Sequence, residues 1–149
     1  MTKIRKYSWK QFDLDVDLLA KEVSTSIKPK SILAISRGGL PLGIKLSNLL
    51  DLPLSIICAR SYFGNAHKHA RTEAKIVGMI KNNMCEPILV VDDIADTGIT
   101  LLRVCQNLKR RHGFSDIHSA VLFYKRESEF IPNYYARMTN AWIEFPWER

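Results

Sequence analysis

The sequence predicts an α/β protein with a Rossmann-like parallel sheet at its core and helices flanking it. Four short segments, at residues 31–36, 54–59, 87–93 and 117–124, are mostly apolar along their whole length rather than alternating. Strands with this pattern are buried on both faces, as in parallel sheets. Segments with helical periodicity separate several of them, as crossover connections require. A chain of 149 residues without repeats or a linker favours a single domain over residues 1–149.

The N-terminal third predicts a helix followed by a strand, a turn and a second helix. Ser8 and Gln11 have the spacing of a capping box, and apolar residues follow at helical spacing. Those apolar residues are Phe12, Val16, Leu19, Ala20 and Val23. The strand at 31–36 ends at the Arg-Gly-Gly of residues 37–39, and residues 42–50 then have helical periodicity.

The middle of the chain is less regular than its two ends. Residues 60–75 are polar and follow neither a helical nor a strand pattern. A segment of about 16 residues is long for a structureless connection in a compact domain, so we expect a lid with a function. A third strand over 87–93, a helix over 97–111 and a fourth strand over 117–124 complete the predicted order.

Composition limits the classes of function. The net charge of +7 favours an anionic partner, either a nucleic acid or a small polyphosphate, and charge alone does not choose between them. No apolar run reaches the ~18 residues of a membrane span, and the N-terminus lacks a signal-peptide core. We therefore expect a cytoplasmic protein without stable membrane insertion. Three cysteines without a CxxC pair favour free thiols over a disulfide framework.

Three unusual segments stand where predicted strands end. They are residues 37–39, residues 92–100 and Lys125. Ligands of open parallel sheets bind beyond the carboxyl ends of the strands, near the point where the strand order reverses. We therefore expect the three segments to meet in one cleft.

The acidic segment is the most informative of the three. Asp92 and Asp93 end an apolar run, and Asp96 follows closely. A single Asp before a helix is usually an N-cap, but three acids this close cannot all be caps. Residues 96–100, Asp-Thr-Gly-Ile-Thr, combine the free N–H groups of a helix start with a glycine and two hydroxyls, which favours a phosphate site. Because this loop holds no lysine, it is not a P-loop, and a single phosphate fits better than a triphosphate.

The two adjacent acids have a separate role. Asp92 and Asp93 immediately precede the phosphate site, where they are suited to accept hydrogen bonds from vicinal hydroxyls or to hold Mg²⁺ through water. A diol site beside a phosphate site predicts a ribose 5-phosphate as the ligand.

Residues 90–100, Val-Val-Asp-Asp-Ile-Ala-Asp-Thr-Gly-Ile-Thr, resemble the phosphoribosyl pyrophosphate (PRPP) signature of type I phosphoribosyltransferases. The resemblance implies that family's fold, a Rossmann-like core with a flexible hood loop and a small C-terminal base-binding hood. It implies Mg²⁺ as the cofactor, with Asp92 and Asp93 at the ribose and the metal, Asp93 holding the metal partly through water. It places Asp96 at the catalytic general-base position. It assigns the 5′-phosphate to a loop composed of Ala95, Asp96, Thr97, Gly98, Ile99 and Thr100, in which Ile99 replaces the family's usual small residue.

Two further segments agree with this resemblance in order and spacing. Arg37 and Gly38 resemble the family's pyrophosphate loop, and residues 60–75 resemble its flexible hood, in which Lys68 and Arg71 are candidate cations. His67 and His69 flank Lys68. They lack a third ligand at a suitable spacing, so we do not expect a zinc site.

The C-terminal part predicts the base. Lys125 and the segment Trp-Ile-Glu-Phe-Pro-Trp at 142–147 resemble the 6-oxopurine site of bacterial xanthine-guanine phosphoribosyltransferases. The resemblance implies that Lys125 holds the 6-oxo group, Trp142 stacks on the ring and the Ile143 carbonyl reads the 2-position. Glu148 stands at the position where that family commonly has an acid, and the segment beyond it is short.

The expected function is purine salvage, in which the 5-phosphoribosyl group of PRPP is transferred to guanine, xanthine or hypoxanthine. The implied partners are PRPP and a purine base, within a homodimer or homotetramer and without nucleic acid. Two alternatives remain open. One is a PRPP-sensing regulator or RNA-binding protein of the same fold without catalysis, and the other is a phosphoribosyltransferase for another base. A receiver-like signalling domain is remote, because here the paired acids come late in the chain and lead into Asp-Thr-Gly.

Overall fold

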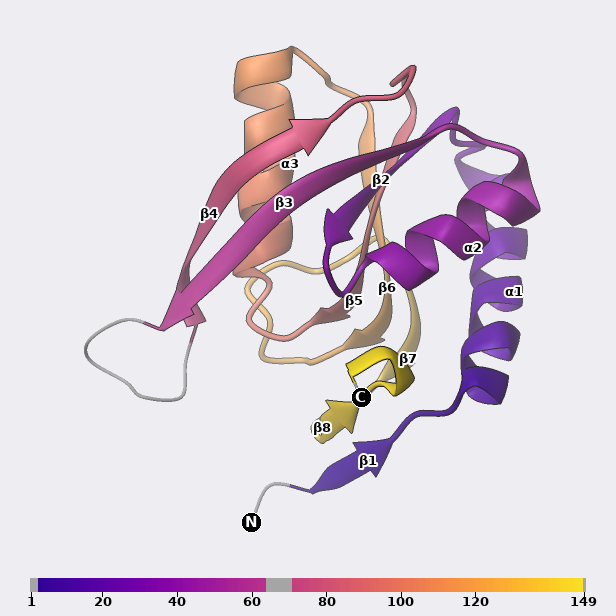
Figure 1. Ribbon diagram of the computed structural model, residues 1–149, viewed down its shortest axis with the longest axis vertical. Coiled ribbons are helices and arrows are strands. Elements are labelled where there is room, and N and C mark those ends of the chain that lie inside the picture. The colour runs from indigo at the N-terminus through magenta and orange to yellow at the C-terminus, as the bar shows by residue number, and fades with distance from the viewer. Residues whose placement is uncertain (1–2, 64–70, 149) are drawn as a thin grey trace.

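A six-stranded sheet forms the centre of the computed structural model, which describes residues 3–63 and 71–148 (Figure 1). Its strands lie in the order β4-β3-β2-β5-β6-β7. They are β2 (Ser31–Ser36), β3 (Leu54–Phe63), β4 (Arg71–Ile80), β5 (Ile88–Ala95), β6 (Ile117–Tyr124) and β7 (Tyr134–Met138). Each neighbouring pair is parallel except β3 with β4, which is antiparallel. The predicted α/β class with a parallel core is confirmed.

The strand order reverses between β2 and β5. From β2 the chain continues to β3 on one side, and it later returns as β5 on the other side of β2. Ala34 of β2 lies opposite Ile56 of β3 and Val91 of β5. The crevice at such a reversal is open at the carboxyl ends of the strands.

Helices cover both faces of the sheet (Figure 1). The helices α1 (Trp9–Ser26) and α2 (Leu40–Leu50) lie on one face, and α3 (Ile99–His112) lies on the other. Within β2, Ile32 and Ala34 pack into the core on the α1 and α2 side, whereas Leu33 and Ile35 pack into the core on the α3 side. This is why the strands are apolar throughout rather than alternating.

The first helix forms as the sequence predicts. The Gln11 amide donates to Ser8 Oγ at 3.2 Å, and the Ser8 amide donates to Gln11 Oε1 at 3.0 Å, which completes the capping box. The five apolar residues predicted for its inner face are all buried. None of the helices in the described ranges is long and apolar enough to cross a membrane.

The predicted start of the helix at Thr97 is wrong by two residues. Gly98 has a φ of 80°, in the left-handed region, so the helical conformation begins only at Ile99. Thr97 and Gly98 therefore belong to the loop that joins β5 to α3.

The prediction of one long loop over residues 60–75 is also wrong. The strand β3 continues to Phe63, β4 begins at Arg71, and the two pair with Arg60 opposite Lys75. Polar residues obscured these strand ends because β4 lies at the edge of the sheet, where solvated side chains do not disfavour a strand. Figure 1 shows the pair projecting beyond the other strands.

Three further short strands were not predicted from the sequence. They are β7, β1 (Ile4–Lys6) and β8 (Trp142–Glu144). The strands β1 and β8 form a separate two-stranded parallel sheet, so both ends of the chain lie near one another (Figure 1). A strand of three residues is too short to carry a readable period. The three cysteines, Cys58, Cys85 and Cys105, are free thiols.

Candidate active site

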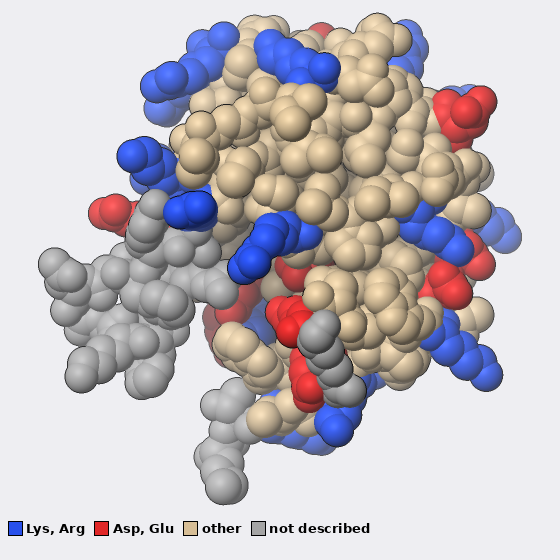
Figure 2. All heavy atoms as spheres, viewed as in Figure 1, with Lys and Arg blue, Asp and Glu red and all other residues tan. Residues whose placement is uncertain are grey.

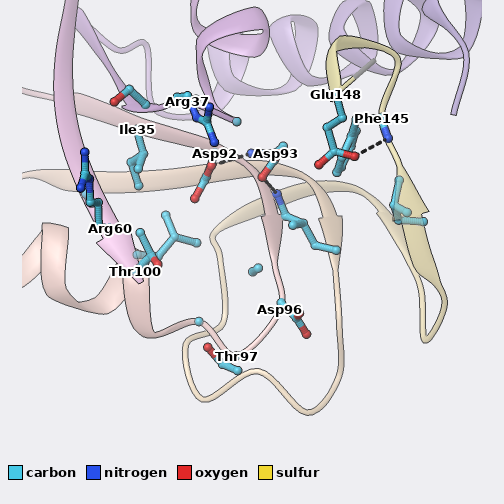
Figure 3. A pocket seen from close by; sticks show the side chains of 18 of the residues that line it. Ile35, Arg37, Arg60, Asp92, Asp93, Asp96, Thr97, Thr100, Phe145 and Glu148 are labelled. Carbon is cyan, nitrogen blue, oxygen red and sulfur yellow. Dashed lines mark hydrogen bonds between the residues drawn. The ribbon is translucent and has the colours of Figure 1, made fainter. Parts of the chain in front are cut away.

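A cavity of about 880 Å³ opens at the carboxyl ends of the central strands (Figure 3). It is lined by the three segments that the sequence predicts to converge, together with the C-terminal residues. The predicted site residues that line it are Arg37, Gly38, Asp92, Asp93, Ala95, Asp96, Thr97, Gly98, Thr100, Lys125, Trp142 and Ile143. Ile99, the first residue of α3, was predicted to belong to the same loop but does not line the cavity.

The two adjacent acids lie within β5, as the predicted strand over 87–93 has them. The strand continues through them to Ala95, with Asp92 opposite Val121 of β6. Asp92 is 9% exposed, and its Oδ1 accepts the amide of Asp93 at 2.9 Å. The Oδ1 of Asp93 accepts the amide of Ile94 at 2.8 Å. Backbone N–H groups thus hold each carboxylate in a fixed direction at the floor of the cavity.

The segment after β2 lies directly against this floor. A Cβ on Gly38 would collide with the carboxylate of Asp93, and a Cβ on Gly39 would lie 2.5 Å from the Val91 carbonyl oxygen. Only glycine lets the backbone approach β5 this closely. The preceding Ser36–Arg37 peptide is cis, and Arg37 is exposed at the rim (Figure 3). A cationic side chain and backbone groups therefore face the acid pair.

The loop from Ala95 to Thr100, here called the phosphate loop, ends at the N-terminus of α3. Free N–H groups and the positive end of the helix dipole are located there, as an anion site requires. The N-cap residue Gly98 has no side chain to cap this end, and the Ile99 amide donates to Thr97 Oγ1 only at a long 3.4 Å. Thr97 and Thr100 add hydroxyl groups to the same part of the lining.

The segment after β6 supports the phosphate loop from outside. The Lys125 amide donates to the Ala95 carbonyl at 3.0 Å, and the Glu129 amide donates to the Thr97 carbonyl at 2.8 Å. Gly98 packs so closely on this segment that a Cβ would collide with Ser128 Oγ and lie 2.6 Å from the Phe130 nitrogen. The loop is therefore held by backbone contacts that many side-chain substitutions would leave in place.

Asp96 and Lys125 form an ion pair in this cavity. Lys125 Nζ lies 2.9 Å from Asp96 Oδ1, and the lysine side chain is 13% exposed against 40% for the aspartate. The sequence predicts separate roles for these residues and not their pairing. Their contact means that a hydrogen-bond donor and a proton acceptor are adjacent in one part of the cavity.

The C-terminal residues form the opposite wall of the cavity, here called the C-terminal wall. It consists of Trp142, Ile143, Phe145, Trp147 and Glu148. Trp142 is 52% exposed, so its ring is accessible to a ligand, whereas Ile143 is buried. Phe145 stacks on Trp147 with ring centroids 4.8 Å apart, and Glu148 Oε2 accepts the Phe145 amide at 3.1 Å.

Sequence reasoning missed Arg60, Phe145 and Trp147 as lining residues. Arg60 follows the predicted strand 54–59 directly, so the rule that sites lie at carboxyl ends of strands was sufficient to find it. The two aromatic residues belong to the segment 142–147 that resembles a purine site, but the resemblance gave them no individual role.

The hood cations cannot be compared with the cavity. Lys68, His67 and His69 lie outside the described residues, and for Arg71 the structure describes the backbone of β4 but not the side chain. In residues 3–63 and 71–148, no group of three or more His, Cys, Asp or Glu side chains is arranged to hold a metal ion.

Comparisons with known proteins agree with this geometry. A family model described as a phosphoribosyl transferase domain matches residues 7–148. The purine phosphoribosyltransferase from Pyrococcus horikoshii is 32% identical, with a TM-score of 0.85 over 98% of this chain and 95% of that one. The Helicobacter pylori xanthine-guanine-hypoxanthine phosphoribosyltransferase is 30% identical, with a TM-score of 0.82 over 97% and 94% of the two chains. A Staphylococcus aureus hypoxanthine phosphoribosyltransferase, at 20% identity, TM-score 0.66 and coverage of 85% and 74%, shares the fold.

Proposed function

The chain belongs to the phosphoribosyl transferase family and is a phosphoribosyltransferase, and we propose that its reaction is the transfer of 5-phosphoribosyl from PRPP to a 6-oxopurine. The products are a nucleoside 5′-monophosphate and pyrophosphate, and the base is guanine, xanthine or hypoxanthine. One observation carries the proposal: a single cavity is lined by the phosphate loop, the acid pair, Lys125 and the C-terminal wall. The names of the two structures with at least 30% identity support a purine as the acceptor.

The phosphate loop would bind the 5′-phosphate of PRPP. The uncapped N-terminus of α3 supplies N–H donors, and Thr97 and Thr100 supply hydroxyls. Asp92 and Asp93 would accept hydrogen bonds from the ribose hydroxyls, since their carboxylates are already oriented by backbone amides. The sugar is then held on one side by its phosphate and on the other by its diol.

The pyrophosphate end of PRPP would lie beside Arg37 and the N–H of Gly38. The acid pair nearby fits Mg²⁺, because it offers only carboxylate oxygens and because Mg²⁺ commonly takes one or two carboxylates plus phosphate oxygens. Asp93 would hold the ion partly through water. When bound, the ion would neutralise charge on the departing pyrophosphate.

In the reaction, a nitrogen of the purine bonds to the anomeric carbon of ribose as the bond from that carbon to pyrophosphate breaks. Positive charge builds on the sugar as the leaving group departs, as in glycoside chemistry. Asp96 would accept or share the N7 proton of the purine, and Lys125 would donate to its 6-oxo group. A purine entering the cavity would replace the Asp96–Lys125 ion pair with two charge-assisted hydrogen bonds to the base.

The test is a set of turnover assays with PRPP, Mg²⁺ and each of guanine, xanthine, hypoxanthine, adenine and orotate. We expect nucleotide to form with at least one 6-oxopurine and not with adenine or orotate. Turnover with adenine or orotate alone would identify a phosphoribosyltransferase for another base. No turnover by a folded sample that still binds PRPP would favour the sensor.

The second candidate, a PRPP sensor or RNA-binding protein without catalysis, is motivated by the net charge of +7. On the face shown in Figure 2, however, Lys and Arg form several separate groups, and acidic residues surround the hollow near the centre. An RNA-binding surface is expected to be a continuous basic patch. A sensor also needs the phosphate loop but has no use for Lys125 and Trp142, so the enzyme is favoured.

We also propose that residues 1–149 act as one domain and that the protein forms a homodimer or homotetramer. Sedimentation would identify which of the two it forms.

A further inference from the structure

The strand β8, which carries Trp142 and Ile143, pairs with only β1 in the described part of the chain. Ile4 lies opposite Trp142, and the Trp142 amide donates to the Lys3 carbonyl at 2.8 Å. Two strands alone are marginally stable in water. Ile143 and Phe145 of the C-terminal wall also pack into the main core, with Phe145 edge-on to Phe123 at 5.9 Å. The position of β8 therefore depends both on these core contacts and on what holds β1 to the rest of the protein (Figure 1).

Tyr7, the residue after β1, provides that attachment. Its side chain is 3% exposed, and its amide donates to the Glu144 carbonyl at 3.0 Å, directly after β8 pairing ends. Its ring packs edge-on against Phe123 of β6 with centroids 4.9 Å apart, and against Phe145 at 5.9 Å. Tyr7 thus contacts the main sheet and the C-terminal wall at the same time.

A cluster of polar groups, in which Asp15 is buried and Arg137 is partly exposed, orients Tyr7. Its hydroxyl donates to Asp15 Oδ2 at 2.7 Å, and Asp15, on α1, is 2% exposed. Arg137 of β7 donates to both oxygens of Asp15, from Nε at 2.8 Å and from Nη2 at 2.9 Å. A buried carboxylate requires such partners, and the bidentate contact restricts its direction. Burial and the hydrogen bond to Asp15 raise the pKa of Tyr7 well above its usual value, so the hydroxyl remains a donor.

We propose that the cluster of Tyr7, Asp15 and Arg137 positions the C-terminal wall for the purine base. None of the three lines the cavity, so the cluster acts through β1 and β8 rather than by touching substrate. It would set the distance between the ring of Trp142 and the side chain of Lys125. A purine must fit into the space between these two groups. This inference rests on the proposed function.

The contacts that hold the phosphate loop do not involve the cluster, so the inference predicts an effect on the purine and not on PRPP. That loop is held by the ends of β5 and α3 and by the segment after β6, where the contacts are to residues 125–130. A cluster that only stabilised the fold would affect both substrates alike when weakened. A cluster that positions the C-terminal wall would affect the purine and spare PRPP.

The principal variant is Tyr7→Phe, which removes the hydroxyl and keeps the ring. We expect the KM for the purine to rise about tenfold, the consequence of losing a hydrogen bond to a charged group. We expect the KM for PRPP and kcat to change by less than about twofold, a difference too small to reflect a lost hydrogen bond. Steady-state kinetics with each substrate varied in turn measures all three quantities.

Ser119→Ala is the matched control. Ser119 is fully buried near the start of β6, away from the cavity, and its hydroxyl contacts Asn133 at 3.1 and 3.2 Å. We expect this variant to lower the melting temperature as Tyr7→Phe does, without changing either KM. Equal rises of both KM values in Tyr7→Phe, or no rise in either, would overturn the inference.

Amide hydrogen exchange tests the same inference without catalysis. In Tyr7→Phe, the Trp142 amide, which donates to the Lys3 carbonyl, should exchange faster than in the wild type. The amides of β5 should keep their protection in both variants, and the Trp142 amide should keep its protection in Ser119→Ala. Absence of purine turnover by the wild type would reject the proposed function alone. Unchanged exchange in β8 of Tyr7→Phe would reject the positioning role, whatever the substrate.

Discussion

The two halves of the cavity are built in different ways. The phosphate half, residues 92–100, is one continuous segment that runs from β5 into α3. The purine half combines Lys125, after β6, with Trp142 and Ile143 on β8, and β8 pairs with a strand at the other end of the chain. The first half is a local arrangement of groups from one segment, and the second is an assembly of groups from distant segments.

This difference predicts different sensitivities. Backbone N–H groups at a helix start remain in place when most nearby side chains change. The purine half depends on packing and on long-range hydrogen bonds, so substitutions outside the cavity should alter purine binding. Asp96 belongs to both halves, because it lies in the phosphate loop and its carboxylate pairs with Lys125.

The largest effect is expected from Asp96→Asn, at the junction of the two halves. The amide cannot accept the purine proton, so kcat should fall by about 10²-fold or more, while PRPP binding is kept. Steady-state assays and calorimetry with PRPP measure the two quantities. Asp13→Asn is the control, because it removes a surface ion pair of 3.0 Å with Lys45. Unchanged kcat in Asp96→Asn would remove the general-base role.

The next largest effect is expected from Gly98→Ala, which changes the phosphate half. Residue 98 has a φ of 80°, which alanine rarely adopts, and the added Cβ would collide with Ser128 Oγ. The loop must therefore move. Strain of this kind predicts that the KM for PRPP rises by about 10- to 100-fold, with less change for the purine.

Gly113→Ala is a close control for Gly98→Ala. Gly113 has a φ of 72° at the other end of α3, and an added Cβ would meet nothing within 4 Å. This variant should lose some stability but keep its KM for PRPP. An equal rise in that KM for both variants would show that the contact of Gly98 with Ser128 has no role.

The smallest of these effects is expected from Trp142→Ala, which changes the purine half. Losing the stacking surface should raise the KM for the purine about tenfold and leave that for PRPP unchanged. Initial rates at varied purine and saturating PRPP measure it. Leu18→Ala is the comparison, since Leu18 on α1 is also an exposed apolar side chain and does not line the cavity. A similar loss in both variants would contradict stacking by Trp142.

The elements of the phosphate half could be predicted from the sequence because they follow one another along the chain. A buried strand, acidic residues, a glycine and a helix start follow one another within residues 88–100, and each has a preference that needs no distant partner. The boundaries were less accurate. The strand continues two residues beyond the predicted end at 93, to Ala95, and Gly98 delays the helix to Ile99.

The purine half was predicted through a resemblance and not from the pattern. Nothing local distinguishes Lys125 from a solvated lysine, and nothing in the three residues of β8 predicts a strand. The end of β3 and the whole of β4 were missed because β4 is an edge strand, which tolerates polar residues.

The sequence by itself determined the α/β class, the order of the central strands and helices along the chain and the position of the loop between β5 and α3, because each depends on periodicity or on neighbouring residues. Only the tertiary structure decided that Asp96 meets Lys125, and that Tyr7, Asp15 and Arg137 join three elements beneath the C-terminal wall. Arg137 lies 122 positions from Asp15 along the chain, and packing of the whole sheet brings the two together. Contacts of that range leave no periodic signal, since they depend on the arrangement of elements rather than on the order of residues.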